Sequence, residues 1–312
     1  MTDTLKKYLF TDRRVRVVTA SLDQSWQDSL QHVQYPEGVR DLLGELVAAA
    51  TLLTANLKLD GSLLLQIQGD GAIALLVVEC RSDLSIRATV KLRSGQSWPQ
   101  GVGLQALLNP GGQGRFVAVL DPRNKLPGQQ AYQAVVPLVG NNVSEVLEHY
   151  MKSSEQLDTR LWLAANDKRA AGLLIQRLPD HGGTLATDSE LPADQMDDSW
   201  ERAVTLASTL SYQELLAHDT DILIHRLFWE ESLLELPPRS IRYFCPCTRE
   251  RVAGMLRMLG QQETDAIIAE QGKIEVQCDF CGKPYVFDPV DAAALFTAPS
   301  PAPSADQAET RH

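Results

Sequence analysis

Cysteine is scarce in this sequence, and the scarcity excludes one class of protein. The 312-residue chain has five cysteines. Small secreted proteins that depend on disulfides carry cysteine far more densely, and residues 1–10 lack the apolar stretch of a secretory signal peptide. We therefore exclude a secreted disulfide framework and expect a cytoplasmic location, where thiols are normally reduced.

Long hydrophobic runs and excess positive charge are also missing from the sequence. The longest uninterrupted apolar run, 72–78, is far shorter than the roughly 20 residues that span a bilayer. The chain has 29 Lys and Arg against 40 Asp and Glu, a formal net charge of -11. An acidic protein is a poor general binder of nucleic acid or anionic membrane. We therefore expect neither among its partners.

Sequence motifs of catalysis are missing as well. The histidines are scattered, with no i,i+4 pair, and there is no nucleophile elbow, Ser/His/Asp order or dinucleotide fingerprint. The glycine-rich segment 111–114 lacks the Lys-Ser/Thr of a phosphate loop and precedes a strand pattern, so it predicts a turn. The sequence therefore predicts a protein that is not an enzyme.

Residues 1–180 have the pattern of one α+β domain. Apolar residues at helical spacing between Val39 and Leu57 predict a long core helix, and Ser21 with Gln24 predicts a capping box for a shorter one. Alternating or continuous apolar segments predict strands at 13–20, 62–68, 72–80, 84–90, 115–120, 132–138 and 159–164. Cys80 ends one of these strands, and a lone buried cysteine is usually inert packing.

Residues 181–240 differ in character, and we expect a helical linker there. The window 180–240 holds thirteen Asp and Glu against three Arg and no Lys, a net charge of 3 − 13 = −10. Its helix at 222–229 is apolar nearly all round, so it must dock on something. Two interpretations stay open: an ordinary interdomain linker, or a metastable one that folds only while its neighbours hold it. In the second case the candidate client-binding residues are Ile222, Leu223, Leu227, Phe228 and Trp229.

The other four cysteines form two close pairs, Cys245-Pro246-Cys247 and Cys278-Asp279-Phe280-Cys281, with thirty residues between the pairs. Four soft sulfur ligands at this spacing fit tetrahedral zinc. A static structural zinc site is one interpretation. The other is a switch between zinc-bound thiolates and disulfides, since sulfurs about 3.7 Å apart around zinc need only a small movement to reach the 2.05 Å or so of an S–S bond.

Residues 241–289 surround these cysteines and predict a small zinc-binding domain. The pattern indicates helices at 248–260 and 263–270 and a hairpin of 273–277 with 284–287. So short a segment builds little core, and structural zinc contributes about 10–16 kcal/mol to folding in small domains. The Ala/Pro/Ser-rich end, 290–312, predicts a disordered tail.

Two other functions compete for the cysteines. A zinc-ribbon nucleic-acid binder needs a basic face, but 241–289 has six basic and seven acidic residues. A thiol-disulfide oxidoreductase using Cys278 and Cys281 needs an exposed, low-pKa cysteine at a helix start, whereas these two lie in a predicted hairpin.

The sequence resembles the family of the redox-regulated heat-shock chaperone (HslO, the thirty-three-kilodalton heat-shock protein). The C-x-C, thirty residues, C-x-x-C pattern carries most of this resemblance, which covers about residues 5–290. Further matching stretches are 8–10, 52–57, 60–61, 68–71, 154–156, 159–160, 172–176, 245–250 and 278–285.

The resemblance implies an ATP-independent holdase with an inactive, reduced form that binds one zinc through the four cysteines. It also implies that oxidation forms the Cys245–Cys247 and Cys278–Cys281 disulfides, releases zinc and unfolds the linker, so that unfolding client proteins are bound. Dimerisation of the oxidised form and transfer of clients to a DnaK-type chaperone are further expectations. The identity of the oxidant, the clients and the client-binding surface stay open.

Overall fold

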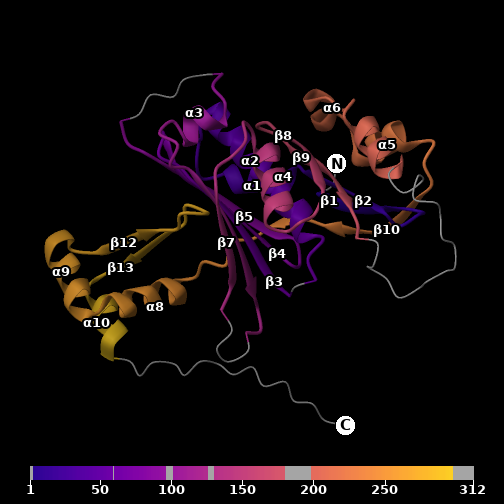
Figure 1. Cartoon of the computed structure of the whole chain (residues 1–312). Coiled ribbons are helices and arrows are strands. Elements are labelled where there is room, and N and C mark those ends of the chain that lie inside the picture. The colour runs from indigo at the N-terminus through magenta and orange to yellow at the C-terminus, as the bar shows by residue number, and fades with distance from the viewer. Residues whose placement is uncertain (1–2, 59, 96–100, 126–129, 180–197, 298–312) are drawn as a thin grey trace, which may run out of the picture. The chain divides into compact units, whose positions relative to one another are not determined.

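The computed structural model describes residues 3–58, 60–95, 101–125, 130–179 and 198–297. The chain forms two compact units, Met1–Phe244 and Cys245–His312. Helices and strands are mixed in both, which confirms the α+β prediction (Figure 1).

The first unit contains a five-stranded antiparallel sheet in the order β10-β1-β2-β9-β8. Its strands are β1 (Thr4–Phe10), β2 (Val15–Leu22), β8 (Thr159–Ala165), β9 (Ala170–Arg177) and β10 (Leu233–Ser240). Strands β2 and β9 are buried along almost their whole length. Strands covered on both faces lose the apolar–polar alternation of a half-exposed strand, and this is why β9 was not predicted.

A second sheet of six strands has the order β11-β5-β4-β3-β6-β7. Its strands are β3 (Gly61–Gln68), β4 (Ile73–Arg81), β5 (Ser85–Leu92), β6 (Arg115–Pro122), β7 (Tyr132–Pro137) and the short β11 (Arg242–Tyr243). The predicted strands of this region are confirmed, and the glycine-rich segment 111–114 is the turn that leads into β6. Strand β11 is parallel to β5 and ends the first unit.

The helix α2 (Glu37–Thr54) packs against strands of both sheets and forms the centre of the main core. Twelve of its 18 residues are buried. Its Gly44 permits close approach to β8, because a Cβ there would lie 2.4 Å from the Cβ of Ala165. Two other helices, α3 (Leu104–Leu108) and α4 (Val143–Ser153), also contribute buried residues to this core.

The predicted capping box at Ser21 is wrong. Ser21 lies inside β2, paired with Thr4 and Ala171, and helix α1 (Gln24–Leu30) begins after Asp23. The carboxylate of Asp3 takes the capping role by accepting hydrogen bonds from the backbone N–H groups of Asp23 (2.5 Å) and Ser25 (2.7 Å). A partner twenty residues away leaves no local sequence pattern.

Helices α5 (Asp198–Ala207), α6 (Tyr212–Ala217) and α7 (Thr220–Phe228), here called the linker helices, pack on the face of the five-stranded sheet opposite α2. A capping box of Ser211 with Glu214 begins α6. Residues 181–197 of the expected linker lie outside the described residues, and its last part is a strand and not a helix, since residues 233–240 form β10. Pro237 and Pro238 are tolerated because β10 is an edge strand with a register shift at this point.

The second unit has a small core around a two-stranded hairpin. It consists of α8 (Arg249–Leu259), α9 (Gln261–Gln271), β12 (Ile274–Gln277), β13 (Pro284–Phe287) and α10 (Pro289–Thr297). The prediction that disorder begins at residue 290 is corrected, because α10 buries Ala292 and Leu295 in this core. The remainder of the predicted tail, 298–312, lies outside the described residues.

Candidate metal centre

The structure brings together all four cysteines of the two motifs. The sulfur atoms of Cys245, Cys247, Cys278 and Cys281 lie within 4.8 Å of one another. The Sγ atoms of Cys245 and Cys278 are 3.7 Å apart, and those of Cys247 and Cys281 are 3.2 Å apart. These contacts join the two halves of the motif, so the site is a single four-sulfur cluster.

The backbone around each motif follows from its local sequence. Cys278 and Cys281 lie in the turn between β12 and β13, where the N–H of Gly282 donates to the carbonyl of Cys278 at 2.8 Å. Gly282 has φ 65°, a conformation that glycine adopts without strain. On the other side, the Thr248 hydroxyl caps α8 and ends the Cys-Pro-Cys segment.

The four thiols differ in their electrostatic surroundings. Burial raises the pKa of Cys281, which is 8% exposed, and also raises the pKa of Cys245. Burial opposes ionisation of Cys247 as well, but interactions with Tyr285 and the neighbouring thiols outweigh it and lower the pKa of Cys247 to about 7. A coordinated metal removes these differences, because it holds every ligand as a thiolate.

Tyr285 is a residue of the site that the sequence pattern did not identify. Its hydroxyl is buried and makes no conventional hydrogen bond among the described residues, yet it lies close enough to Cys247 to lower that thiol's pKa. The antiparallel pairing of Val276 with Tyr285 sets its position in the hairpin. Tyr285 did fall within a stretch that matches the family, but without an assigned role.

The donor set fits a metal ion. Four thiolates are the ligands of many structural zinc sites, and tetrahedral zinc with Zn–S of about 2.3 Å places the sulfurs roughly 3.7 Å apart. The observed sulfur separations bracket this value. The four cysteines can therefore hold a metal ion.

Cys80 stands apart from this cluster. It is completely buried on β4 in the main core, and burial raises the pKa of its thiol to about 12. A buried, protonated thiol is a poor nucleophile and a poor metal ligand. The expectation of inert packing agrees with this environment.

The apolar residues of α7 do not all have the same environment. Leu223, Leu227 and Phe228 are buried against the sheet, whereas Ile222 is 48% exposed and Trp229 is 70% exposed. Phe228 packs edge-on against Phe10 of β1, with ring centroids 5.8 Å apart. In this conformation the helix therefore hides three of the five candidate client-binding side chains.

Polar contacts also fasten the linker helices to the sheet. Arg169 is buried and directly precedes β9. It pairs with Asp23 at 2.6 Å and donates hydrogen bonds to the carbonyls of Leu216 (2.9 Å) and His218 (3.2 Å). Lys6 of β1 pairs with Asp221 of α7 at 2.6 Å. Charged residues that meet only in the folded chain have no recognisable sequence spacing, so these contacts were not predicted.

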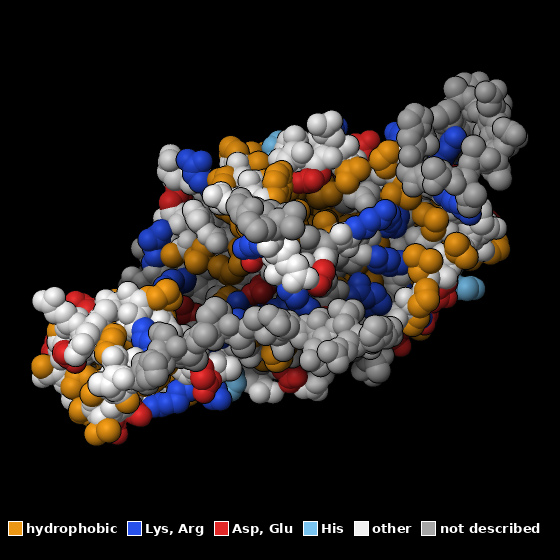
Figure 2. Space-filling view, turned by 90° about the horizontal axis from the view of Figure 1, so that it is seen from below, with side chains coloured by type: hydrophobic (Ala, Val, Ile, Leu, Met, Phe, Trp, Pro, Cys, Tyr) orange, Lys and Arg blue, Asp and Glu red, His pale blue; other side chains and the backbone are white. Residues whose placement is uncertain are grey.

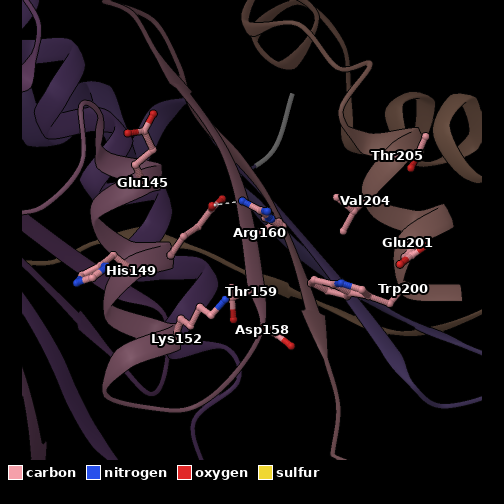
Figure 3. Close-up of a pocket in the computed structure, with 11 residues that line it drawn as sticks. Glu145, His149, Lys152, Asp158, Thr159, Arg160, Trp200, Glu201, Val204 and Thr205 are labelled. Atoms are coloured by element: carbon pink, nitrogen blue, oxygen red, sulfur yellow. Dashed lines mark hydrogen bonds and ion pairs between the residues drawn. The ribbon is translucent and has the colours of Figure 1, made fainter. Parts of the chain in front are cut away.

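A polar cavity of about 600 Å³ separates α5 from α4 and β8 (Figure 3). Trp200, Glu201, Val204 and Thr205 line it on α5, and the opposite wall carries the ion pair of Arg160 with Glu148 at 2.8 Å. The fully buried α5 residues that face the sheet, Ala203 and Ala207, are small, and Trp200 and Leu206 pack there partly buried. The cavity leaves one side of α5 without packing against α4 and β8.

Glu45 of α2 lies beside α6 in surroundings that disfavour its charged form. It lines a cavity with Tyr212 and Leu215 of α6, and burial, with Asp41 nearby, raises its pKa from 4.5 to about 8. Two further carboxylates, those of Glu145 and Glu148, line the same cavity. The folded state therefore keeps a proton that the unfolded state loses near pH 4.5, and stability falls as pH rises from about 4.5 to 8.

We expect Glu45→Gln to remove this slope. Between pH 5.5 and 7.5 the free energy of unfolding of the wild-type first unit should fall by more than about 1.4 kcal/mol, the equivalent of one pKa unit, while the variant stays flatter. Denaturant unfolding followed by tryptophan fluorescence measures both. Parallel pH profiles for the two proteins would contradict the assignment.

Within the part of the chain that the structure describes, no helix combines the length and apolar character that crossing a membrane requires.

Comparison with known sequences gives consistent matches along the chain. The family model described as Hsp33 protein matches residues 3–288. A 33 kDa chaperonin from Methylobacillus flagellatus is 46% identical over 298 residues, 95% of each chain. One from Chromobacterium violaceum is 43% identical over 294 residues, 94% of each chain, and one from Pseudomonas aeruginosa is 40% identical over 311 residues, 99% of each chain.

A solved structure agrees at the level of the fold. The crystal structure of the 33 kDa chaperonin (heat shock protein 33 homologue) of Thermotoga maritima matches with a TM-score of 0.77 at 21% identity, covering 95% of this chain and 98% of that chain. The chain therefore belongs to the Hsp33 family, whose named members are chaperones and not enzymes.

Proposed function

We propose that this protein is a redox-regulated, ATP-independent chaperone of the holdase type. The convergence of four thiols within 4.8 Å, in a unit with a small core, carries the proposal. In the reduced form Cys245, Cys247, Cys278 and Cys281 hold one zinc ion, which supplies much of the folding energy of the second unit. This form is inactive.

Oxidation of the cysteines is the switching step. Thiolates are the oxidisable form of cysteine, and each disulfide forms with the loss of two electrons. Two equivalents of a two-electron oxidant, such as peroxide or hypochlorous acid, take up the four electrons and are reduced to water or to chloride and water. The products are the Cys245–Cys247 and Cys278–Cys281 disulfides, and the zinc ion, without ligands, is released.

Loss of the metal then frees the linker. Strands β10 and β11 lead to Phe244, the last residue of the first unit, and Cys245 follows directly. Unfolding of the second unit therefore removes the folded anchor at the C-terminal end of these strands. The window 180–240, which contains the linker helices, carries a net charge of −10, so like charges oppose its compact state, and a cavity lies along one side of α5. Their departure uncovers apolar residues on α7 and on the sheet, which bind unfolding proteins.

Partners and location complete the proposal. We expect the clients to be partly unfolded proteins, the oxidised form to be a homodimer, and clients to pass to a DnaK-type chaperone system after reduction. The protein would act in the cytoplasm, where reducing conditions keep the zinc form until oxidative stress occurs.

The test measures zinc content and suppression of client aggregation on one purified sample, before and after peroxide at elevated temperature. We expect one zinc per chain in the reduced protein, and loss of zinc together with a gain of aggregation suppression after oxidation. If the protein kept its zinc and gained no activity, the cluster would be a static structural zinc site and the proposed switch would be wrong. An insulin-reduction assay separates the competing oxidoreductase function, for which we expect no activity.

A further inference from the structure

An apolar cavity of about 260 Å³ lies between the two sheets of the first unit. Its apolar lining comes from α2, α4, β3 and β6 and from the segments that follow α2, α4 and β9, and includes Leu53, Leu57, Leu63, Leu65, Leu120 and Met151. None of the cysteines lines this cavity. Its volume is a little below the roughly 300–1,000 Å³ of pockets for drug-sized ligands, so a ligand that fills it is small.

The amide of Asn56 is an unsatisfied polar group in the wall of this cavity. Both Nδ2 and Oδ1 are buried and have no hydrogen-bond partner within the described residues. A buried polar group without a partner costs about 1–3 kcal/mol, and native structures rarely retain one. Asn56 therefore offers the N–H donors of its amide and one carbonyl acceptor to a molecule that occupies the cavity.

Positive charge gathers at the same place. Arg16 of β2 lines the cavity, and its Nη1 donates to Oε1 of Gln176 at 3.4 Å. Lys7 of β1 donates to the carbonyl of Ala55, next to Asn56, and Arg239 of β10 is close enough to influence Lys7. In the described parts of the chain no carboxylate forms an ion pair with any of these three cations.

The shifts in pKa agree with this charge imbalance. Burial lowers the pKa of Arg16, and burial together with Arg16 and Arg239 lowers the pKa of Lys7 to about 8. The acidic residue in the lining, Glu155, accepts a hydrogen bond from the Tyr150 hydroxyl at 2.5 Å. Although the chain is acidic overall, one face of the molecule shows Lys and Arg side chains beside apolar ones (Figure 2).

We propose that this cavity binds a small amphipathic carboxylate of the medium-chain fatty-acid type. Its apolar body would fill the space among the leucines, and its carboxylate would pair with Arg16 and accept a hydrogen bond from Nδ2 of Asn56. The guanidinium fork suits a carboxylate, and the pairing neutralises a half-buried cation. An amine of the same length would meet like charge, and an alcohol would leave Arg16 without a counter-ion.

The test uses the reduced full-length protein, titrated with octanoate by calorimetry and by NMR of the side-chain amides. We expect saturable binding at one site and movement of the Asn56 amide resonance, which is assigned by its disappearance in Asn56→Leu. Octylamine should not bind. Arg16→Gln should weaken octanoate about tenfold or more, whereas Arg115→Gln, an exposed arginine at the start of β6, should leave the affinity unchanged.

A further variant and two further ligands test the proposal independently of Arg16. Leu57→Phe fills the cavity without changing its charge and should also weaken octanoate, and circular dichroism confirms that each variant is folded. Equal binding of octanoate and octylamine, or no saturable binding, would overturn the proposal and leave a water-filled cavity. A short apolar peptide with a free C-terminal carboxylate shares the chemistry, and binding of this peptide without binding of octanoate would also overturn it.

Discussion

Cys281→Ser is expected to abolish metal binding and to unfold the second unit while the first unit stays folded. Cys281 is the most buried of the four clustered cysteines, and its sulfur contacts that of Cys247. Structural zinc contributes about 10–16 kcal/mol in small domains, as much as or more than the 5–15 kcal/mol that stabilises a typical domain. The remaining core of this unit is one cluster of seven buried residues, Ala253, Leu256, Ile274, Tyr285, Phe287, Ala292 and Leu295.

Zinc content and amide NMR dispersion of residues 245–297 measure this effect. The matched control is Cys80→Ala, which removes the remaining cysteine of the chain and should leave zinc content unchanged, because Cys80 is in the core of the other unit. A Cys281→Ser protein without zinc but with native dispersion in α8–α10 would show that the apolar cluster suffices. The proposed switch would then lack its energetic basis.

The cysteine cluster is the part of the molecule that the sequence predicts best. One or two intervening residues keep the sulfurs of a pair such as Cys245 and Cys247 close together in any fold. Two such pairs in a short segment therefore predict a shared metal site or disulfides. The contribution of Tyr285 was not predictable in the same way. It depends on the register of β12 against β13, which is a property of the pairing and not of either strand.

The fold was predicted where a strand or helix is covered on one side or has a clear period. Strands β3, β5, β6 and β7 meet that condition, and β4 was predicted from its continuous apolar run, whereas β1, β9 and β10 were missed. The sequence of β9, AAGLLIQR, has no alternation because both of its faces are buried, and its partner β2 lies about 150 residues earlier in the chain. The two prolines of β10 argue against a strand in the sequence, although an edge strand tolerates them.

The apolar helix α7 illustrates what composition leaves undetermined. Its residues predict that it must dock, and it does, but a helix apolar nearly all round does not indicate which side meets the protein. The choice is made by the sheet, where Tyr8, Phe10, Val15 and Val17 form the complementary surface. Ile222 and Trp229 consequently point away from it and are exposed.

Phe228→Ala is expected to release the linker helices and to activate the reduced, zinc-loaded protein without oxidant. Phe228 is 2% exposed and contacts the ring of Phe10, and truncation of a buried phenylalanine costs about 3–5 kcal/mol. Helix α7 is held by one apolar face and by the Lys6–Asp221 ion pair, and a cavity lies beside the neighbouring α5, so we expect local undocking to precede global unfolding. We expect suppression of client aggregation well above that of the reduced wild type, with zinc still bound.

Trp229→Ala is the matched control, since the adjacent aromatic residue is 70% exposed and its truncation removes little packing. Limited proteolysis within 198–228 reports undocking independently of chaperone activity, and the two readouts separate the causes of failure. Phe228→Ala with the protease resistance of Trp229→Ala would contradict the packing argument. Rapid proteolysis without aggregation suppression would confirm that Phe228 holds the linker but would contradict the proposal that undocking is what exposes the client-binding surface.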